Sequence, residues 1–116
     1  MDFIFRLPRF PVILDTGDVL IHANSKSQLV SKVAKIKFTD NGTKDIIDAQ
    51  AVGFTLYPEK MFVAPAIVNR RWTKLQIIEL YNAKKKAGAP ELRITSLGSR
   101  SLESIVGEAV KLLSGK

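Results

Sequence analysis

A chain of 116 residues with 46% hydrophobic and 25% charged side chains has the size and composition of one globular domain with its own core. It contains no cysteine, which excludes disulfides, thiolate nucleophiles and cysteine-ligated metals and suits the reducing cytosol, so we expect a cytoplasmic protein. Its net charge of +7 comes mainly from residues 70–100, where eight lysines and arginines stand against two glutamates.

No segment has the length or composition of a membrane span. The amino-terminal residues are broken by Arg6, Pro8, Arg9 and Pro11, which leaves no room for the apolar core of a signal peptide. The longest apolar run, residues 61–68, has eight residues and contains a proline, whereas a spanning helix needs about 20. We expect a small soluble domain with no membrane partner.

Prolines and a glycine turn organise the first 22 residues into short strands. Residues 3–7 and 11–14 favour β-structure, and their prolines confine them to sheet edges or strand starts. Residues 15–18 have turn composition, with Gly17 free to take a positive φ, and residues 19–22 return as a strand. The pattern predicts a β-hairpin.

A helix is predicted from about residue 25 to residue 36. Ser25 and Gln28 have the spacing of a capping box, and apolar residues then recur at helical intervals. We expect the three lysines of this segment on its outer face; they are Lys26, Lys32 and Lys35.

The next part of the chain favours strands. Residues 40–42 (Asp-Asn-Gly) mark a turn between a short β-favouring stretch at 36–38 and a longer one at 46–57. Residues 61–68 predict a further strand, with a proline at its edge or end. Two aspartates, Asp45 and Asp48, adjoin the longer stretch, and we interpret them as solvated charges or edge protection.

Two more helices are predicted in the last third of the chain. Thr73 and Gln76 have the spacing of a second capping box, and the helix that they open spans about 74–87. Residues 92–97 predict a short strand, and a single apolar stripe predicts the last helix at about 101–114.

These elements form one domain over residues 1–116, because no linker, repeat or low-complexity tract divides them. The expected fold class is α+β. A mainly antiparallel sheet of five or six strands should pack with the three helices.

A cluster of cations between residues 70 and 100 is the candidate binding site. Each phosphate that a protein neutralises releases condensed counterions, so cations gathered on one surface attract nucleic acid, and they also attract an acidic protein. In the alternative interpretation, the lysines only end a helix, where cations are favourable, and the other charges are ordinary solvated side chains. The candidate residues are Arg70, Arg71, Lys84, Lys85, Lys86, Arg93 and Arg100.

Residues 12–21, VILDTGDVLI, resemble the first motif of the haloacid dehalogenase family, in which a strand delivers a nucleophilic aspartate followed by a glycine turn. The resemblance implies that Asp15 is the nucleophile of a hydrolase. The chain is short for that family's doubly wound sheet, and it lacks the paired late aspartates that hold magnesium there. Because a β-hairpin has the same local pattern, we interpret Asp15 and Asp18 first as turn residues.

Residues 70–113 resemble the Myb/SANT-like helix-turn-helix pattern, with Trp72-Thr73 opening a helix and Arg100-Ser101 preceding a final apolar-striped helix. The resemblance implies that the last helix reads the DNA major groove. That helix carries Glu103 and Glu108 against Lys111, and the segment before it has a proline and a β-branched run where the family has a middle helix.

The composition offers few residues for catalysis. His22 is the only histidine, so a zinc site or a Ser-His-Asp triad would depend on it, and no glycine-rich phosphate loop occurs. We therefore expect a non-catalytic binding domain, with no cofactor or metal, that takes nucleic acid or another polyanion through residues 70–100. Two alternatives stay open: a protein-interaction domain that forms a homodimer or binds an acidic partner, and a hydrolase that uses Asp15.

Overall fold

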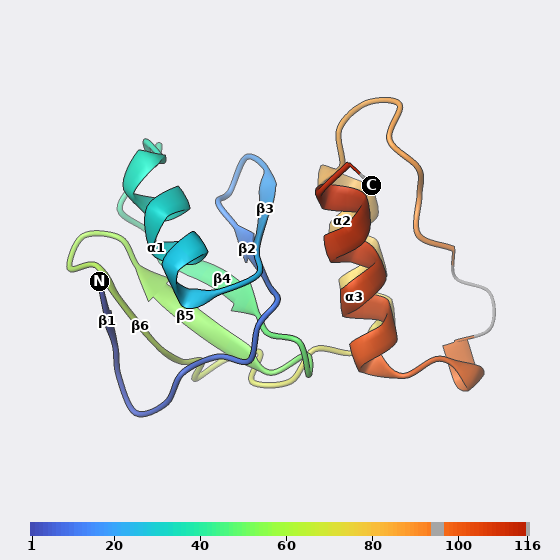
Figure 1. Ribbon diagram of the computed structural model, residues 1–116, viewed down its shortest axis with the longest axis horizontal. Coiled ribbons are helices and arrows are strands. Elements are labelled where there is room, and N and C mark those ends of the chain that lie inside the picture. The colour runs from blue at the N-terminus through green and yellow to red at the C-terminus, as the bar shows by residue number, and fades with distance from the viewer. Residues whose placement is uncertain (94–96, 116) are drawn as a thin grey trace.

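The computed structural model describes residues 1–93 and 97–115 of the chain. Within these residues it has a six-stranded sheet and three α-helices, which confirms the predicted α+β class (Figure 1). The strands are β1 (Asp2–Phe3), β2 (Val12–Asp15), β3 (Leu20–Ala23), β4 (Lys44–Ile47), β5 (Gly53–Tyr57) and β6 (Phe62–Pro65). The helices are α1 (Lys26–Lys35), α2 (Lys74–Lys84), the short 3-10 helix η1 (Leu97–Ser99) and α3 (Leu102–Leu113).

The sheet has the strand order β1-β6-β5-β4-β2-β3 and is mainly antiparallel, as predicted. The exception is β1, which runs parallel to β6. Only the first residue of the strand predicted at 3–7 joins the sheet, and Phe5 has a φ of 71°, outside strand geometry. At the other end of the order, β3 has a strand neighbour on one side only within the described residues.

The predicted hairpin is present as β2 and β3. The backbone N–H of Thr16 donates to the Val19 carbonyl at 3.0 Å, and Gly17 takes a φ of 99°. The carboxylate of Asp15 accepts the Gly17 N–H at 2.9 Å. The aspartate and the glycine therefore form the turn for which their residue types are suited.

The turn predicted at residues 40–42 does not separate two strands, and this prediction is wrong. Residues 36–38 lie outside the sheet, and the stretch at 46–57 divides into β4 and β5 around a turn at 48–52. The Asp48 carboxylate makes this turn by accepting the N–H groups of Gln50 at 2.8 Å and Val52 at 2.9 Å. Because the segment has no glycine, proline or asparagine, its composition carries no strong turn signal.

The three predicted helix starts are confirmed by their caps, and at α3 the Ser101 side chain accepts the N–H of Ser104. Ser25 caps α1 through the N–H of Gln28, although the Gln28 side chain accepts the N–H of Asn24 rather than that of Ser25. Thr73 and Gln76 form both halves of the box that opens α2. No helix among the described residues is long and apolar enough to cross a membrane.

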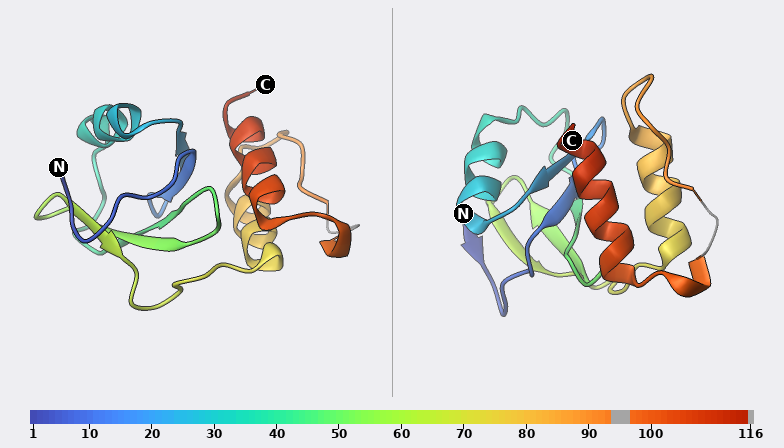
Figure 2. Two further views of the ribbon diagram at one scale, coloured as in Figure 1. Left: turned by 60° about the horizontal axis from the view of Figure 1, so that its bottom comes forward. Right: turned by 45° about the vertical axis from the view of Figure 1, so that its right-hand side comes forward.

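The sheet has a hydrophobic core on each face. Successive residues of a strand point to opposite faces, so Val12 and Leu14 pack with Leu29 of α1, whereas Ile13 packs with residues of α2 and α3. Figure 2 shows α1 over one face and the pair α2 and α3 side by side near β2 and β3. The sheet and these helices carry the residues of the candidate sites.

The strand predicted at residues 92–97 falls partly outside the described residues. Leu92 and Arg93 are described and do not lie in a strand, and residue 97 begins η1. Leu92 is buried in the α2–α3 core. The side chain of Asn82 accepts the Leu92 N–H at 2.9 Å and donates to the Leu92 carbonyl at 3.0 Å, so a contact with α2 occupies the groups that a strand would use.

Candidate functional site

The basic residues predicted as one site are distributed over separate places in the fold. Arg70 and Arg71 precede α2, whereas Lys84 ends this helix and Lys85 and Lys86 follow it. The 11 residues of α2 separate the two groups by about 16 Å at a rise of about 1.5 Å per residue. The structure therefore does not bring the arginines and the lysines together.

Two of the predicted cations are paired with carboxylates. The Lys84 ammonium lies 2.6 Å from a carboxylate oxygen of Asp15, and Arg100 forms an ion pair with Glu108. Arg93 is exposed on the segment after α2. A phosphate would have to compete with these carboxylates for Lys84 and Arg100.

Two further arginines lie beside Arg70 and Arg71. Two adjoining hollows, with volumes of about 440 and 360 Å³, share Arg6, Val52 and Arg71 in their linings. Arg70 lines the first hollow and Arg9 lines the second. Four guanidinium-bearing residues from two distant segments thus share one surface, which we call the arginine face (Arg6, Arg9, Arg70 and Arg71).

Arg6 and Arg9 were not among the predicted site residues. In the sequence they only interrupt an apolar run, and no local pattern relates residues 6–9 to residues 70–71. They become neighbours because Arg9 bonds to the turn at 48–49 and residues 70–71 pair with residues 52–53, which directly follow that turn. A prediction of that proximity would need the strand order, which one sequence does not provide.

Gly53 fixes the position of the segment that carries Arg70 and Arg71. Its N–H donates to the Arg70 carbonyl at 2.7 Å, and Val52 forms an isolated β-bridge with Arg71. A Cβ atom at position 53 would lie 1.9 Å from the backbone oxygen of Asn69, so only glycine lets the chain approach this closely. The arginines are therefore presented by a segment that is held against the sheet.

Asp48 fixes the position of the segment that carries Arg9. Its residue is 3% exposed, and one of its carboxylate oxygens accepts the backbone N–H of Arg9 at 3.2 Å. The backbone of Arg9 in turn accepts the N–H of Ala49 at 2.8 Å. The interpretation of Asp48 as a solvated or edge-protecting charge is wrong, because its carboxylate is a buried acceptor that joins two segments.

Exposed apolar side chains adjoin the arginines. Phe5 is 91% exposed and Ile67 is 77% exposed, and both line the first hollow. The guanidinium carbon of Arg6 lies 5.5 Å from the ring centroid of Phe54, a cation–π contact that supports its position. The surface therefore offers both cations and an aromatic ring to a partner.

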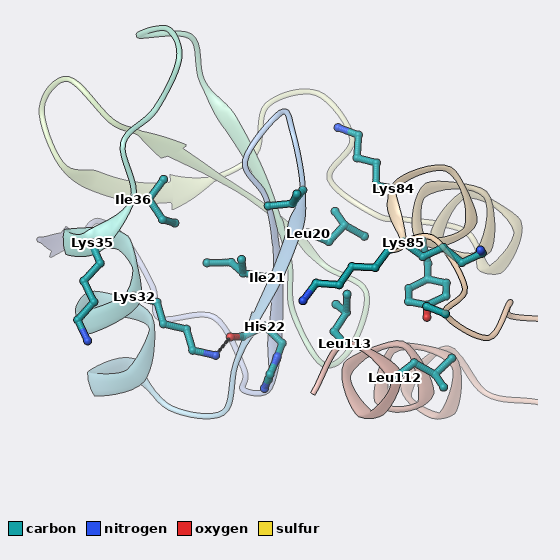
Figure 3. Close-up of a pocket in the computed structure, with 14 residues that line it drawn as sticks. Leu20, Ile21, His22, Lys32, Lys35, Ile36, Lys84, Lys85, Leu112 and Leu113 are labelled. Carbon is teal, nitrogen blue, oxygen red and sulfur yellow. Dashed lines mark hydrogen bonds between the residues drawn. The ribbon is translucent and has the colours of Figure 1, made fainter. Parts of the chain in front are cut away.

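A second basic surface is a groove of about 480 Å³ between α1, β3 and the ends of α2 and α3 (Figure 3). We call it the lysine groove, because five lysines line it together with apolar residues. His22 also lines it, and burial, with a smaller contribution from the Lys32 charge, lowers the pKa of His22 from its ordinary value of 6.5. The lysines at its border are Lys32, Lys35, Lys84, Lys85 and Lys86.

The surroundings of Asp15 differ from those that the haloacid dehalogenase resemblance implies. Its strand, β2, lies between β3 and β4 and is antiparallel to both. The Asp15 carboxylate accepts the Gly17 N–H and the Lys84 ammonium, which is the role of a turn residue and an ion-pair partner. Among the described residues, no group of three or more histidine, aspartate or glutamate side chains is placed to hold a metal ion.

The helix pair also departs from the Myb/SANT-like pattern. Glu103 is exposed on α3, and Glu108 on the same helix pairs with Arg100. Between α2 and α3 the described residues contain only the three-residue helix η1. No family model, curated protein or solved structure matches this chain. The arginine face and the lysine groove are the features from which a function can be argued.

Asp45 provides a test of the electrostatics on the α2 side of the sheet. Burial, and then the nearby Asp15 carboxylate, raises the pKa of Asp45 above its ordinary value of 3.8, although Lys84 opposes this. The folded chain thus holds the Asp45 proton more tightly than the unfolded chain, so the free energy of unfolding falls as the pH rises above the ordinary pKa of 3.8. Asp45→Asn is therefore expected to raise the melting temperature at pH 7. The gain should shrink as the pH falls and disappear below pH 3.8.

Thermal unfolding followed by circular dichroism from pH 3 to pH 7 measures this difference. Asp18→Asn changes an exposed carboxylate in the turn between β2 and β3 and is the matched control, which we expect to leave the melting temperature unchanged. A lower melting temperature for Asp45→Asn at pH 7 would show that the attraction to Lys84 outweighs burial and the Asp15 charge.

Proposed function

We propose that this chain is a non-catalytic binding domain that takes single-stranded nucleic acid on the arginine face. The observation that supports the proposal is the gathering of Arg6, Arg9, Arg70 and Arg71 around two adjoining hollows. Among the described residues that line these hollows, Asp48 is the one carboxylate, and backbone N–H groups already occupy its oxygens. An anion would meet little competition there.

Guanidinium groups suit phosphate in particular. Their planar arrangement of N–H donors matches two phosphate oxygens at once, and they stay protonated at every physiological pH. Release of condensed counterions adds a favourable term for each phosphate that is neutralised. This chemistry supports a polyanion rather than a single carboxylate as the partner.

The exposed ring of Phe5 favours a single strand over a duplex. Bases in a single strand present their faces, and stacking on an aromatic side chain contributes about 1–3 kcal/mol per base. A duplex hides those faces, and reading its major groove needs a basic helix or strand. The α3 helix carries Glu103 and Glu108 and does not supply one.

The test is a salt titration of binding to a labelled single-stranded oligonucleotide, as DNA and as RNA, with the corresponding duplex for comparison. Each neutralised phosphate contributes about −0.7 to the slope of log affinity against log salt for a single strand. Arg70→Gln/Arg71→Gln is therefore expected to make the slope shallower by about 1.4 and to weaken low-salt binding by about tenfold or more. Fluorescence anisotropy measures both quantities.

Two further variants separate the contribution of the arginines from that of net charge and from that of the Phe5 ring. Lys85→Gln/Lys86→Gln removes the same charge at the other end of α2 and is expected to leave the slope unchanged. Phe5→Asn removes the ring with a residue that tolerates the φ of 71°, and it is expected to weaken binding without changing the slope.

Three results would overturn the proposal. The first is affinity that is absent at low salt or does not change with salt, and the second is an equal loss in the lysine variant. The third is a dimer in sedimentation that Ile67→Ser/Val68→Ser converts to a monomer, because these exposed apolar residues would then form an assembly surface.

A further inference from the structure

The lysine groove combines an apolar lining with a cationic border. Figure 3 shows β3 in the middle of the groove, with Lys32 and Lys35 of α1 on one side and Lys84 and Lys85 at the end of α2 on the other. Apolar side chains come from all four elements around the groove; examples are Leu20 and Ile21 of β3, Ile36 after α1, Tyr81 of α2, and Leu112 and Leu113 of α3. Among the described lining residues there is no carboxylate.

Two of the five lysines are held by the protein. The Lys32 ammonium donates to the His22 carbonyl at 2.6 Å, and the Lys84 ammonium lies 2.6 Å from Asp15. The structure gives the ammonium groups of Lys35, Lys85 and Lys86 no hydrogen bond or ion pair with any residue that it describes. Three cations therefore border an apolar groove and are available to a ligand.

We propose that the lysine groove binds an amphipathic anion, a small molecule with an apolar body such as an alkyl chain and one anionic head group. The body would cover the leucine and isoleucine side chains, and the head group would lie at the cationic border, which Lys35 forms on the α1 side and Lys85 and Lys86 form on the α2 side. Small-molecule sites typically combine a mainly apolar lining with a small number of polar groups and have volumes of about 300–1,000 Å³. The groove of about 480 Å³ lies within that range.

The strand edge in the groove argues against a peptide as the occupant. An extended peptide would add to the free edge of β3 by pairing with its outward backbone groups. The Lys32 ammonium already occupies the His22 carbonyl, which is one of these groups. Covering an edge by a neighbouring element in this way protects it against strand addition, so a small ligand fits the groove better than a strand does.

Dodecanoate is the probe for the test, used below its micelle concentration with isothermal titration calorimetry. We expect saturable binding of one dodecanoate per chain, with weaker binding of dodecanol and weaker still of dodecyltrimethylammonium. Lys35→Gln/Lys85→Gln/Lys86→Gln is expected to lower the dodecanoate affinity by about tenfold and to leave that of dodecanol unchanged. Because these side chains have no described partner, the variant should keep its melting temperature.

Two controls distinguish this site from bulk charge and from the arginine face. Lys37→Gln/Lys60→Gln/Lys111→Gln removes the same charge from residues outside the groove lining and is expected to leave dodecanoate binding unchanged. Arg70→Gln/Arg71→Gln is also expected to have no effect on it, so either proposal can fail while the other stands. A loss with either control equal to that of the groove variant would overturn the inference.

Three further results of the binding measurements would contradict the proposed anion site. Absence of saturable dodecanoate binding, or binding of dodecyltrimethylammonium as tight as that of dodecanoate, would overturn the inference. It would also be overturned if a glutamate-rich peptide protected the β3 amides from hydrogen exchange while dodecanoate did not bind, because the groove would then be a peptide site.

Discussion

Gly53→Ala is expected to destabilise the fold by about 3 kcal/mol or more, because the new methyl group has no space. A Cβ atom at this position would lie 1.9 Å from the backbone oxygen of Asn69, and a backbone atom cannot move aside as the end of a flexible side chain can. The Gly53 N–H also donates to Arg70, and its carbonyl accepts the N–H of Ala66 at 3.0 Å. Displacing the segment would therefore break both hydrogen bonds that join Gly53 to residues 66–70.

Urea unfolding of Gly53→Ala measures the loss, and the oligonucleotide assay measures its functional consequence. We expect the variant to bind weakly even where it is still folded, since Arg70 and Arg71 would leave the arginine face. Gly107→Ala is the matched control, because nothing lies within 4 Å of its Cβ position in α3 and alanine favours a helix over glycine by about 0.5–1 kcal/mol. A Gly53→Ala protein with the wild-type unfolding midpoint would show that residues 67–71 are not held against β5.

The parts of this fold that could be predicted from sequence are those with local causes. Caps at Ser25 and Thr73 identify helix starts, because each requires only side chains three residues apart. The β2–β3 turn is marked by an aspartate and a glycine inside four residues. The turn at 48–52 has no such local marker, because it depends on the carboxylate of one aspartate rather than on glycine or proline.

The arrangement of charge was much harder to predict, because its causes are not local. Helix α2 separates Arg71 from Lys84, although both belong to one basic stretch of the sequence. The partner of Lys84 is Asp15, which is 69 positions away, and the neighbours of Arg71 on its face include Arg6. The position of cations along the chain therefore predicts two of the four members of the arginine face, Arg70 and Arg71, and does not indicate where the face ends.

Asp48→Ala is the second change for which we expect a large effect, a loss of about 3 kcal/mol in the free energy of unfolding. The substitution leaves three backbone N–H groups without their acceptor, and each buried unsatisfied group costs about 1–3 kcal/mol unless water replaces the carboxylate. Asp18→Ala, an exposed aspartate of another turn, is the control and is expected to cost less than about 0.5 kcal/mol. Equal unfolding midpoints for the two variants would show that the carboxylate of Asp48 does not support its turn.

Asp48→Asn separates the turn from the arginine face. The amide oxygen can still accept the N–H groups of Gln50 and Val52, which share one oxygen of Asp48, but the amide nitrogen would face the N–H of Arg9 donor to donor. We expect this variant to keep most of the stability that Asp48→Ala loses and to weaken oligonucleotide binding, because the Arg9 segment is released while β4 and β5 stay joined. Binding that follows stability alone in both variants would mean that Arg9 is not part of the binding surface, since its position would then have no influence on affinity.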